Sequence, residues 1–269
     1  MTGRAHMDII GGLFFSARLK IELANTHIGY LNTLLRRLPD DEVYRVGVEY
    51  DSEAGKYRLK VEGAQGVLAD FPLLTGDIVH HLRSALDHAA TAIVGMGSAS
   101  IYFPFHERKE KFITCSKVRA INQACPGLGD YIVAELEPYN GGRTGLWPLT
   151  KLDAIDKHKL IVTVIGITDV GFEQITDENN NVWRNCMASV RGGNVIFPFT
   201  STAKMKIEGK VKPSFDIFFG QGTFFENQSI IPTLTNMSQA VSEAIDAIAQ
   251  FVRDAGGIVG RNPDHKAAS

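Results

Sequence analysis

Apolar residues recur along this chain with two different periods, and this limits the folds that the chain can adopt. In several long segments they recur every three or four residues, which is the spacing of one face of a helix. Between residues 44 and 62, and again after residue 172, they alternate with polar residues as in half-buried strands. The two patterns together predict an α+β fold, mainly a helical bundle with an inserted β-hairpin and a small peripheral antiparallel sheet.

The helical period predicts a core of long helices. We expect them near residues 13–38, 72–95, 146–165 and 233–254, with shorter helices over 109–118 and 129–135, so that the helical core covers 13–38, 72–165 and 233–254. Pro39 follows the first of these segments, and Gly256 and Gly257 follow the last. Proline cannot continue a helix and glycine is common just after one, so both ends are marked in the sequence.

The alternating segments predict strands. Two runs joined by a turn at residues 51–55 indicate a β-hairpin over 43–63, whose polar face places it at the outside of the bundle. The region 170–230 predicts the antiparallel sheet, with strands at 172–176, 182–190, 195–199 and 215–219. A loop before the last strand carries four lysines, Lys204, Lys206, Lys210 and Lys212.

Length and composition allow one large domain or two small ones, and we expect a single domain over residues 1–260, followed by a flexible tail over 261–269. The chain has 269 residues, of which 44% are hydrophobic, so it can bury a sizeable core. Its net charge of -2 argues against strong non-specific RNA binding, which needs a basic face.

The three cysteines form no CxxC pair, so we expect a reducing, cytoplasmic location. No apolar run approaches the ~20 residues of a bilayer span, so we expect no membrane partner.

The sharpest chemical signal is a group of polar residues inside the second helical segment. Arg83 and Asp87 are four residues apart, so they can pair on one side of a helix. A second row contains His81, Ser84 and His88. On the later helix Asp156 falls among apolar positions, and a carboxylate there needs a partner because burying it alone costs several kcal/mol. Arg83, His81 and His88 are the candidate partners.

The segment His81-Leu-Arg-Ser-Ala-Leu-Asp-His88 resembles the HEPN superfamily, whose motif is an arginine followed after four to six residues by a histidine. The resemblance covers this helix and the general helical layout. It implies a helical bundle that forms a homodimer, in which two motifs build one metal-independent endoribonuclease site that acts on RNA. Arg83 and His88 match the two defining positions, and Ser84 stands where the family has a polar residue. No cofactor or metal is implied.

This chemistry would be coherent for RNA cleavage. His88 would move a proton near neutral pH, and Arg83 would hold the charge of the phosphate with a fork of donors, to which Ser84 adds a hydrogen bond. From their charge and position we infer supporting roles for Asp87, which would hold the arginine, and for Asp156, which would orient His88. His81, in the same row as Ser84 and His88, is the third supporting residue.

Two other functions remain open. In the first, the protein is a non-catalytic dimeric interaction or structural protein, and Arg83, Asp87, His88 and Asp156 form a buried polar network. The protein partner would then be unknown. In the second, a metal hydrolase or oxygenase would use a set of helix-borne side chains, namely His80, His81, Asp87, His88, Asp153, Asp156 and His158. The metal function is disfavoured because the chain lacks a Glu-x-x-His pair. His27, alone on the apolar face of the first helix, predicts a core histidine.

Overall fold

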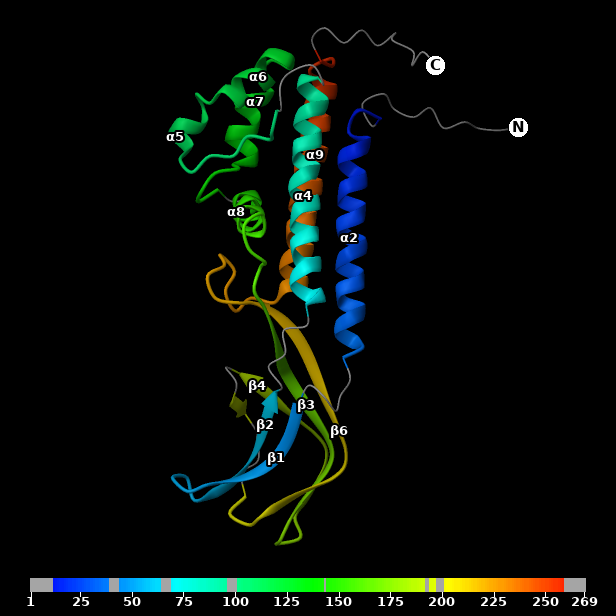
Figure 1. Ribbon diagram of the computed structural model, residues 1–269, viewed down its shortest axis with the longest axis vertical. Coiled ribbons are helices and arrows are strands. Elements are labelled where there is room, and N and C mark those ends of the chain that lie inside the picture. Colours follow the sequence, from blue (N-terminus) through cyan, green and yellow to red (C-terminus); the bar gives the residue numbers. More distant parts are fainter. Residues whose placement is uncertain are drawn as a thin grey trace, which may run out of the picture. The chain divides into compact units, whose positions relative to one another are not determined.

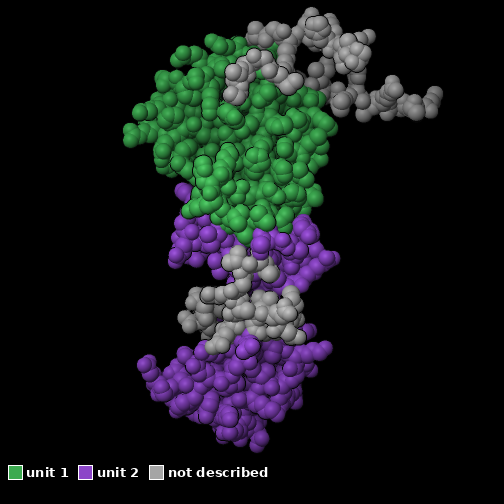
Figure 2. Space-filling model, in the orientation of Figure 1, with its two compact units in different colours: residues 1–29, 72–161, 231–269 green, residues 30–71, 162–230 purple. Residues whose placement is uncertain are grey.

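The computed structural model describes residues 12–38, 44–63, 69–95, 101–142, 144–191, 194–196 and 201–258. It is an α+β protein, as the two apolar periods predict (Figure 1). The chain divides into two compact units, one formed by residues 1–29, 72–161 and 231–269 and the other by 30–71 and 162–230 (Figure 2). One domain over residues 1–260 stays a prediction, and the predicted tail at 261–269 lies outside the described residues.

The first unit is helical. Its long helices match the predicted segments closely: α2 is Phe15–Arg36, α4 is Asp70–Val94 and α9 is Ile230–Asp254. Helix α2 continues into the second unit over residues 30–36, and α4 and α9 begin in that unit at residues 70–71 and 230. The shorter helices are α5 (Lys109–Phe112), α6 (Ser116–Ala124), α7 (Leu128–Tyr131), the π-helical turn η1 (Ile132–Leu136) and α8 (Leu146–Asp156). None of the helices within the described ranges has both the length and the apolar character that crossing a bilayer would require.

Helix α4 is the element that carries the motif residues. Most of its apolar side chains are buried, and Leu73 near its start is an exposed exception. The buried ones include Ile78, Leu82, Ala85, Leu86, Ala89 and Ile93. The helix ends at Gly95, which has φ of 96° and donates its N–H to the Thr91 carbonyl at 2.8 Å. Glycine adopts this left-handed conformation without steric cost, so the helix stops there.

Helix α2 contacts two other helices of the first unit. Ser238 of α9 donates a hydrogen bond to Asn25 of α2 at 2.6 Å. The ring of His27 lies 5.4 Å from the ring of His81 on α4. The buried residues of α2 recur in steps of three and four, at Phe14, Ala17, Ile21, Ala24, Ile28, Leu31, Leu35 and Leu38. This repeat gives α2 one continuous apolar face toward the protein interior.

The predicted helix over 146–165 is wrong in its second half. Helix α8 ends at Asp156, and strand β3 runs over Thr163–Asp177, nine residues earlier than predicted at its start. The segment after residue 160 is rich in β-branched residues, and Thr163 and Ile165 pair with Phe219 and Ile217 of strand β6. Long-range pairing of this kind decides between helix and strand in a short apolar run, and the run by itself does not.

The second unit is built from strands. Strands β1 (Tyr44–Asp51) and β2 (Lys56–Gly63) form the predicted hairpin, in which Val46 pairs with Val61 and Val48 with Leu59. A four-stranded antiparallel sheet has the order β5-β4-β3-β6, with β4 at Val182–Arg191 and β5 at Asn194–Ile196. The hairpin packs its apolar residues into a common core with this sheet. The buried members of that core are Leu59, Val170, Phe172, Ile175, Ala188 and Met205.

The predicted lysine loop is also wrong. Strand β6 spans Met205–Phe219, so Lys206, Lys210 and Lys212 belong to a strand. It pairs with β3 over its whole length, with irregular steps between Ile167 and Asp169 and between Phe172 and Gln174. Apolar residues recur at the odd positions of β6, from Met205 and Ile207 to Ile217 and Phe219, so the alternation is present in the sequence. Gly209 and Pro213 interrupt it with residue types that are typical of turns. The predicted strand at 195–199 is described only up to Ile196.

Candidate functional site

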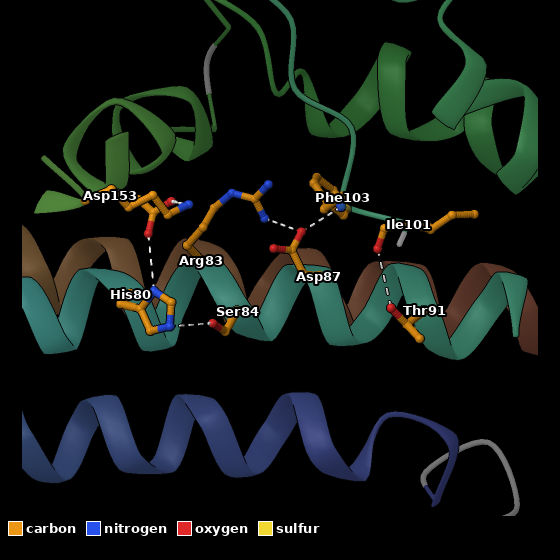
Figure 3. A network of polar contacts seen from close by, with 9 residues as sticks. His80, Arg83, Ser84, Asp87, Thr91, Ile101, Phe103 and Asp153 are labelled. Carbon is orange, nitrogen blue, oxygen red and sulfur yellow. Dashed lines mark hydrogen bonds and ion pairs between the residues drawn. The ribbon is translucent and has the colours of Figure 1, made fainter. Parts of the chain in front are cut away.

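An extended segment, residues 101–105, lies against one row of side chains on α4 (Figure 3). The hydroxyl of Thr91 donates to the Ile101 carbonyl at 3.4 Å, and the N–H of Phe103 donates to Oδ1 of Asp87 at 2.7 Å. The guanidinium carbon of Arg83 lies 4.6 Å from the centre of the Phe105 ring. The contacts go from Thr91 through Asp87 to Arg83 on the helix while they go from Ile101 through Phe103 to Phe105 on the segment. The segment therefore runs antiparallel to the helix.

The spacing of these contacts follows from backbone geometry. Four residues of helix rise about 6 Å, and two residues of extended chain rise about 6.6 Å. Every fourth residue of α4 therefore meets every second residue of the segment. We call this set of contacts, made by Arg83, Asp87 and Thr91 with residues 101, 103 and 105, the α4 clip.

The ion pair between Arg83 and Asp87 is the centre of the α4 clip. Nη1 of Arg83 contacts Oδ1 of Asp87, the same oxygen that accepts the Phe103 N–H. The exposed fraction is 11% for the Arg83 side chain and 22% for Asp87. The i,i+4 pairing predicted from the sequence is therefore confirmed, and the Phe105 ring adds a cation–π contact to the guanidinium.

Ser84 belongs to a different group of polar residues, shown in the same view (Figure 3). Its hydroxyl lies 3.4 Å from Nε2 of His80, and Nδ1 of His80 lies 3.5 Å from Oδ1 of Asp153 on α8. The buried Asp153 carboxylate also receives a hydrogen bond from Lys157 at 2.6 Å, through Oδ2. Its Oδ1 makes no hydrogen bond to any described residue, because 3.5 Å is too long for a strong one.

His81 faces helix α2, away from the α4 clip. Its ring lies beside that of His27, and Nδ1 of each ring is buried without a hydrogen-bond partner among the described residues. Burial lowers the pKa of His81 below its usual value, and Lys20, His27 and His80 lower this pKa further, while Asp77 opposes them. His27 is only partly buried, so its core role stays a prediction. The lowered pKa of His81 favours a neutral imidazole at neutral pH.

Asp156 lies far from His88, one of the three partners that the sequence offered it. Its carboxylate packs against Gly76 of α4, where a methyl group would overlap it. Gly76 precedes His88 by twelve residues, which is about 18 Å along a helix. The hypothesis that Asp156 orients His88 is therefore wrong. Burial raises the pKa of Asp156, and the carboxylates of Asp153 and Asp77 raise it further, with only His80 acting against them.

The two residues that define the HEPN motif do not share a face of α4. His88 is half-buried and follows Arg83 by five residues, which turns it about 140° around the helix axis. Arg83 lies with Asp87 and Phe105, whereas Ser84 lies with His80. The described chain thus separates the three residues predicted to be catalytic into different surroundings.

The positions of the candidate metal ligands bear on the proposed metal function. Across the ranges that the structure describes, no three histidine, cysteine, aspartate or glutamate side chains gather in a way that would hold a metal ion. Of the seven candidates, His80 and Asp153 approach each other, and Lys157 already occupies one oxygen of Asp153. His158 follows the end of α8 and is exposed.

Sequence reasoning missed the contribution of the 101–105 segment. Phe103 and Phe105 alternate on either side of a proline, a pattern that indicates an extended segment but not its partner. His80 and Asp153 were recognised only as metal candidates. His80 and Ser84 are four residues apart on one helix, and so are Asp153 and Lys157. This spacing could have predicted the polar contact within each pair.

No protein-family model matches this chain, and the searches of curated proteins and of solved structures also found no match. The resemblance to the HEPN superfamily therefore rests on the residues of α4.

Proposed function

We propose that this protein is a non-catalytic interaction or structural protein, in which Arg83 and Asp87 serve the fold. The observation that carries this proposal is the double use of Asp87. One carboxylate oxygen pairs with the Arg83 guanidinium and also accepts the N–H of Phe103, a buried residue. A carboxylate in this position neutralises the buried charge of Arg83. It also holds the backbone segment that contains Phe103, which belongs to no helix or strand.

The burial of Arg83 supports the same proposal. An arginine that stabilises a phosphodiester during cleavage must present its donors to a ligand that arrives from water. Arg83 is 9% exposed, its guanidinium lies against Phe105, and one of its nitrogens is committed to Asp87. The positive charge is therefore already neutralised inside the first unit.

The HEPN-type ribonuclease is the hypothesis that must be distinguished from this one. We suggest incubating the purified chain with RNA in EDTA, beside its Arg83→Ala and His88→Ala variants. We expect no cleavage above the buffer control in any of the three. We also expect Arg83→Ala to lower the free energy of unfolding by about 2–3 kcal/mol, because Asp87 loses its counter-ion, and His88→Ala to lower it by less than about 1 kcal/mol.

Two outcomes would overturn the proposal. EDTA-resistant cleavage that disappears in both variants, while both remain folded, would establish the metal-independent ribonuclease. Cleavage that appears only after Mg²⁺ or Zn²⁺ is added would instead establish a metal-dependent enzyme.

A further inference from the structure

Two histidine rings meet where helices α2 and α4 contact each other inside the first unit. The ring of His27 on α2 lies 5.4 Å from the ring of His81 on α4, and the two ring planes are tilted by 57°. Both residues are only partly buried, so they lie near the surface of the unit. We call these two residues the histidine pair.

Each ring of the histidine pair has a nitrogen that makes no hydrogen bond. Nδ1 of His27 and Nδ1 of His81 are both buried, and neither atom has a hydrogen-bond partner among the described residues. Most buried polar atoms in proteins are hydrogen-bonded, because an unbonded one loses the hydrogen bonds that it made to water. Two such atoms on neighbouring rings point to a ligand that both can bind.

The distance between the rings suits a metal ion that both of them hold. Zinc binds a histidine nitrogen at about 2.0–2.1 Å, and that nitrogen lies about 1.2 Å from the centre of its ring. With a tetrahedral angle at the metal, the centres of two such rings are about 5.2 Å apart. The observed distance of 5.4 Å agrees with this value. A ring contact without a metal also allows this distance, but it leaves both nitrogens unbonded.

We propose that the histidine pair binds a divalent transition-metal ion of the zinc type, which joins α2 to α4 through Nδ1 of each ring. Imidazole nitrogen is a preferred ligand of such ions, and water can take a coordination position that the protein leaves open. Among the described residues no group of three metal-binding side chains forms, so we expect a weak site with two protein ligands. This inference goes beyond the proposed function, because the α4 clip does not depend on a link between α2 and α4.

The charges around the histidine pair are compatible with a bound cation. Histidine must be neutral to bind a metal, and burial lowers the pKa of His81, which favours the neutral form. Lys20 lowers the same pKa and Asp77 raises it, so a positive and a negative group both lie near this ring. Asp77 is exposed and precedes His81 by four residues, which places both on one side of α4. The carboxylate therefore offsets the charge of Lys20 at the site.

Titration of the full chain with Zn²⁺, followed by calorimetry, tests this site. The chain is first treated with EDTA and dialysed, so that it starts without metal. We expect one Zn²⁺ to bind per chain with a dissociation constant of about 1–100 μM. At a Zn²⁺ concentration ten times that constant, the melting temperature should rise by about 2–4 °C, because the ion binds the folded chain.

Substitutions of single histidines show which residues hold the ion. His27→Gln and His81→Gln keep a polar side chain, and each should weaken Zn²⁺ binding at least about tenfold because one imidazole is lost. Far-UV circular dichroism checks that both variants fold. His158→Gln is the matched control, since His158 is an exposed histidine outside α2 and α4, and it should bind Zn²⁺ as the wild-type chain does. His80→Gln should also retain binding, because His80 lies toward Asp153 on α8.

A measurement on the wild-type chain keeps the test valid if a variant fails to fold. Of the eight histidines, we expect Zn²⁺ to shift the ring nitrogen signals of two in NMR spectra, and these two rings should show a nuclear Overhauser contact with each other. Shifts confined to other histidines would overturn the proposal, as would the absence of binding at 1 mM Zn²⁺. Binding that survives His27→Gln and His81→Gln, or that is lost equally in His158→Gln, would overturn it too. Loss in His80→Gln alone would place the ion at His80 and Asp153, and would also contradict the proposal.

Discussion

The α4 clip predicts a specific pattern of losses when its members are truncated. In Asp87→Ala the Arg83 charge stays buried with no counter-ion, and the Phe103 N–H loses its acceptor. Breaking a buried pair in this way costs about 3–5 kcal/mol, and the 22% exposure of Asp87 reduces the expected loss to about 2–4 kcal/mol. In Arg83→Ala the Asp87 carboxylate keeps its bond to Phe103, so we expect the smaller loss of about 2–3 kcal/mol.

The assay is urea unfolding at neutral pH, analysed as a double-mutant cycle. Because each single variant strands the other charge, the double variant should be more stable than the sum of the two losses implies, by about 1–2 kcal/mol. Glu107→Ala is the control, since Glu107 pairs with Lys151 only at 3.9 Å on the surface, and we expect it to cost less than about 0.5 kcal/mol. Single variants that match this control, or losses that add without coupling, would refute the clip.

Three further predictions concern the neighbouring polar residues. Asp156→Asn should raise the free energy of unfolding at pH 7 by about 0.5 kcal/mol, because it removes a carboxylate whose pKa is raised by burial and by Asp153 and Asp77; a loss of stability in urea unfolding would contradict this. Gly76→Ala should change the free energy of unfolding by less than about 1 kcal/mol, because the methyl group displaces the movable Asp156 carboxylate while alanine favours the helix by about 1 kcal/mol. In the Asp156→Ala background, where that obstacle is absent, Gly76→Ala should stabilise the chain by about 0.5–1 kcal/mol, and a loss there would place the strain elsewhere. The pKa of His81 is lowered, so the folded state binds a proton at His81 less tightly than the unfolded chain does. The free energy of unfolding should therefore fall as the pH drops below 6.5. His81→Gln should make that fall shallower, and an unchanged fall in this variant would assign it to another group.

The sequence predicted the long helices well because their apolar residues keep one period over many turns. The boundaries of α2, α4 and α9 lie within a few residues of the predicted ones. The hairpin was equally clear, since two alternating runs flank a turn in which Gly55 has φ of 63° and Asp51 accepts the N–H groups of residues 53 and 54. Local chemistry alone determines features of this kind.

The errors arose where a distant partner decides the structure. Residues 160–165 read equally well as the end of a helix, but α8 ends at Asp156 and residues 163–165 form the start of β3, which pairs with β6. The lysines of β6 read as a loop because Gly209 and Pro213, residue types typical of turns, interrupt an alternation that otherwise runs through the strand. In the candidate site, the Arg83–Asp87 pair was predictable from its i,i+4 spacing, whereas the partner of Asp87 at Phe103 is sixteen residues away. The position of Asp156 against Gly76 depends on how two helices pack, which no spacing encodes.

Amide hydrogen exchange at Phe103, followed by NMR, tests most directly whether Asp87 holds the 101–105 segment on α4. Phe103 is buried and its N–H donates to Asp87 at 2.7 Å, so its exchange in the wild-type chain should be slowed by at least about a hundredfold relative to an unstructured peptide. In Asp87→Ala that protection should be lost, while amides in the middle of helix α9 keep theirs. Free exchange at Phe103 in the wild-type chain, or full protection in Asp87→Ala, would contradict the role assigned to Arg83 and Asp87.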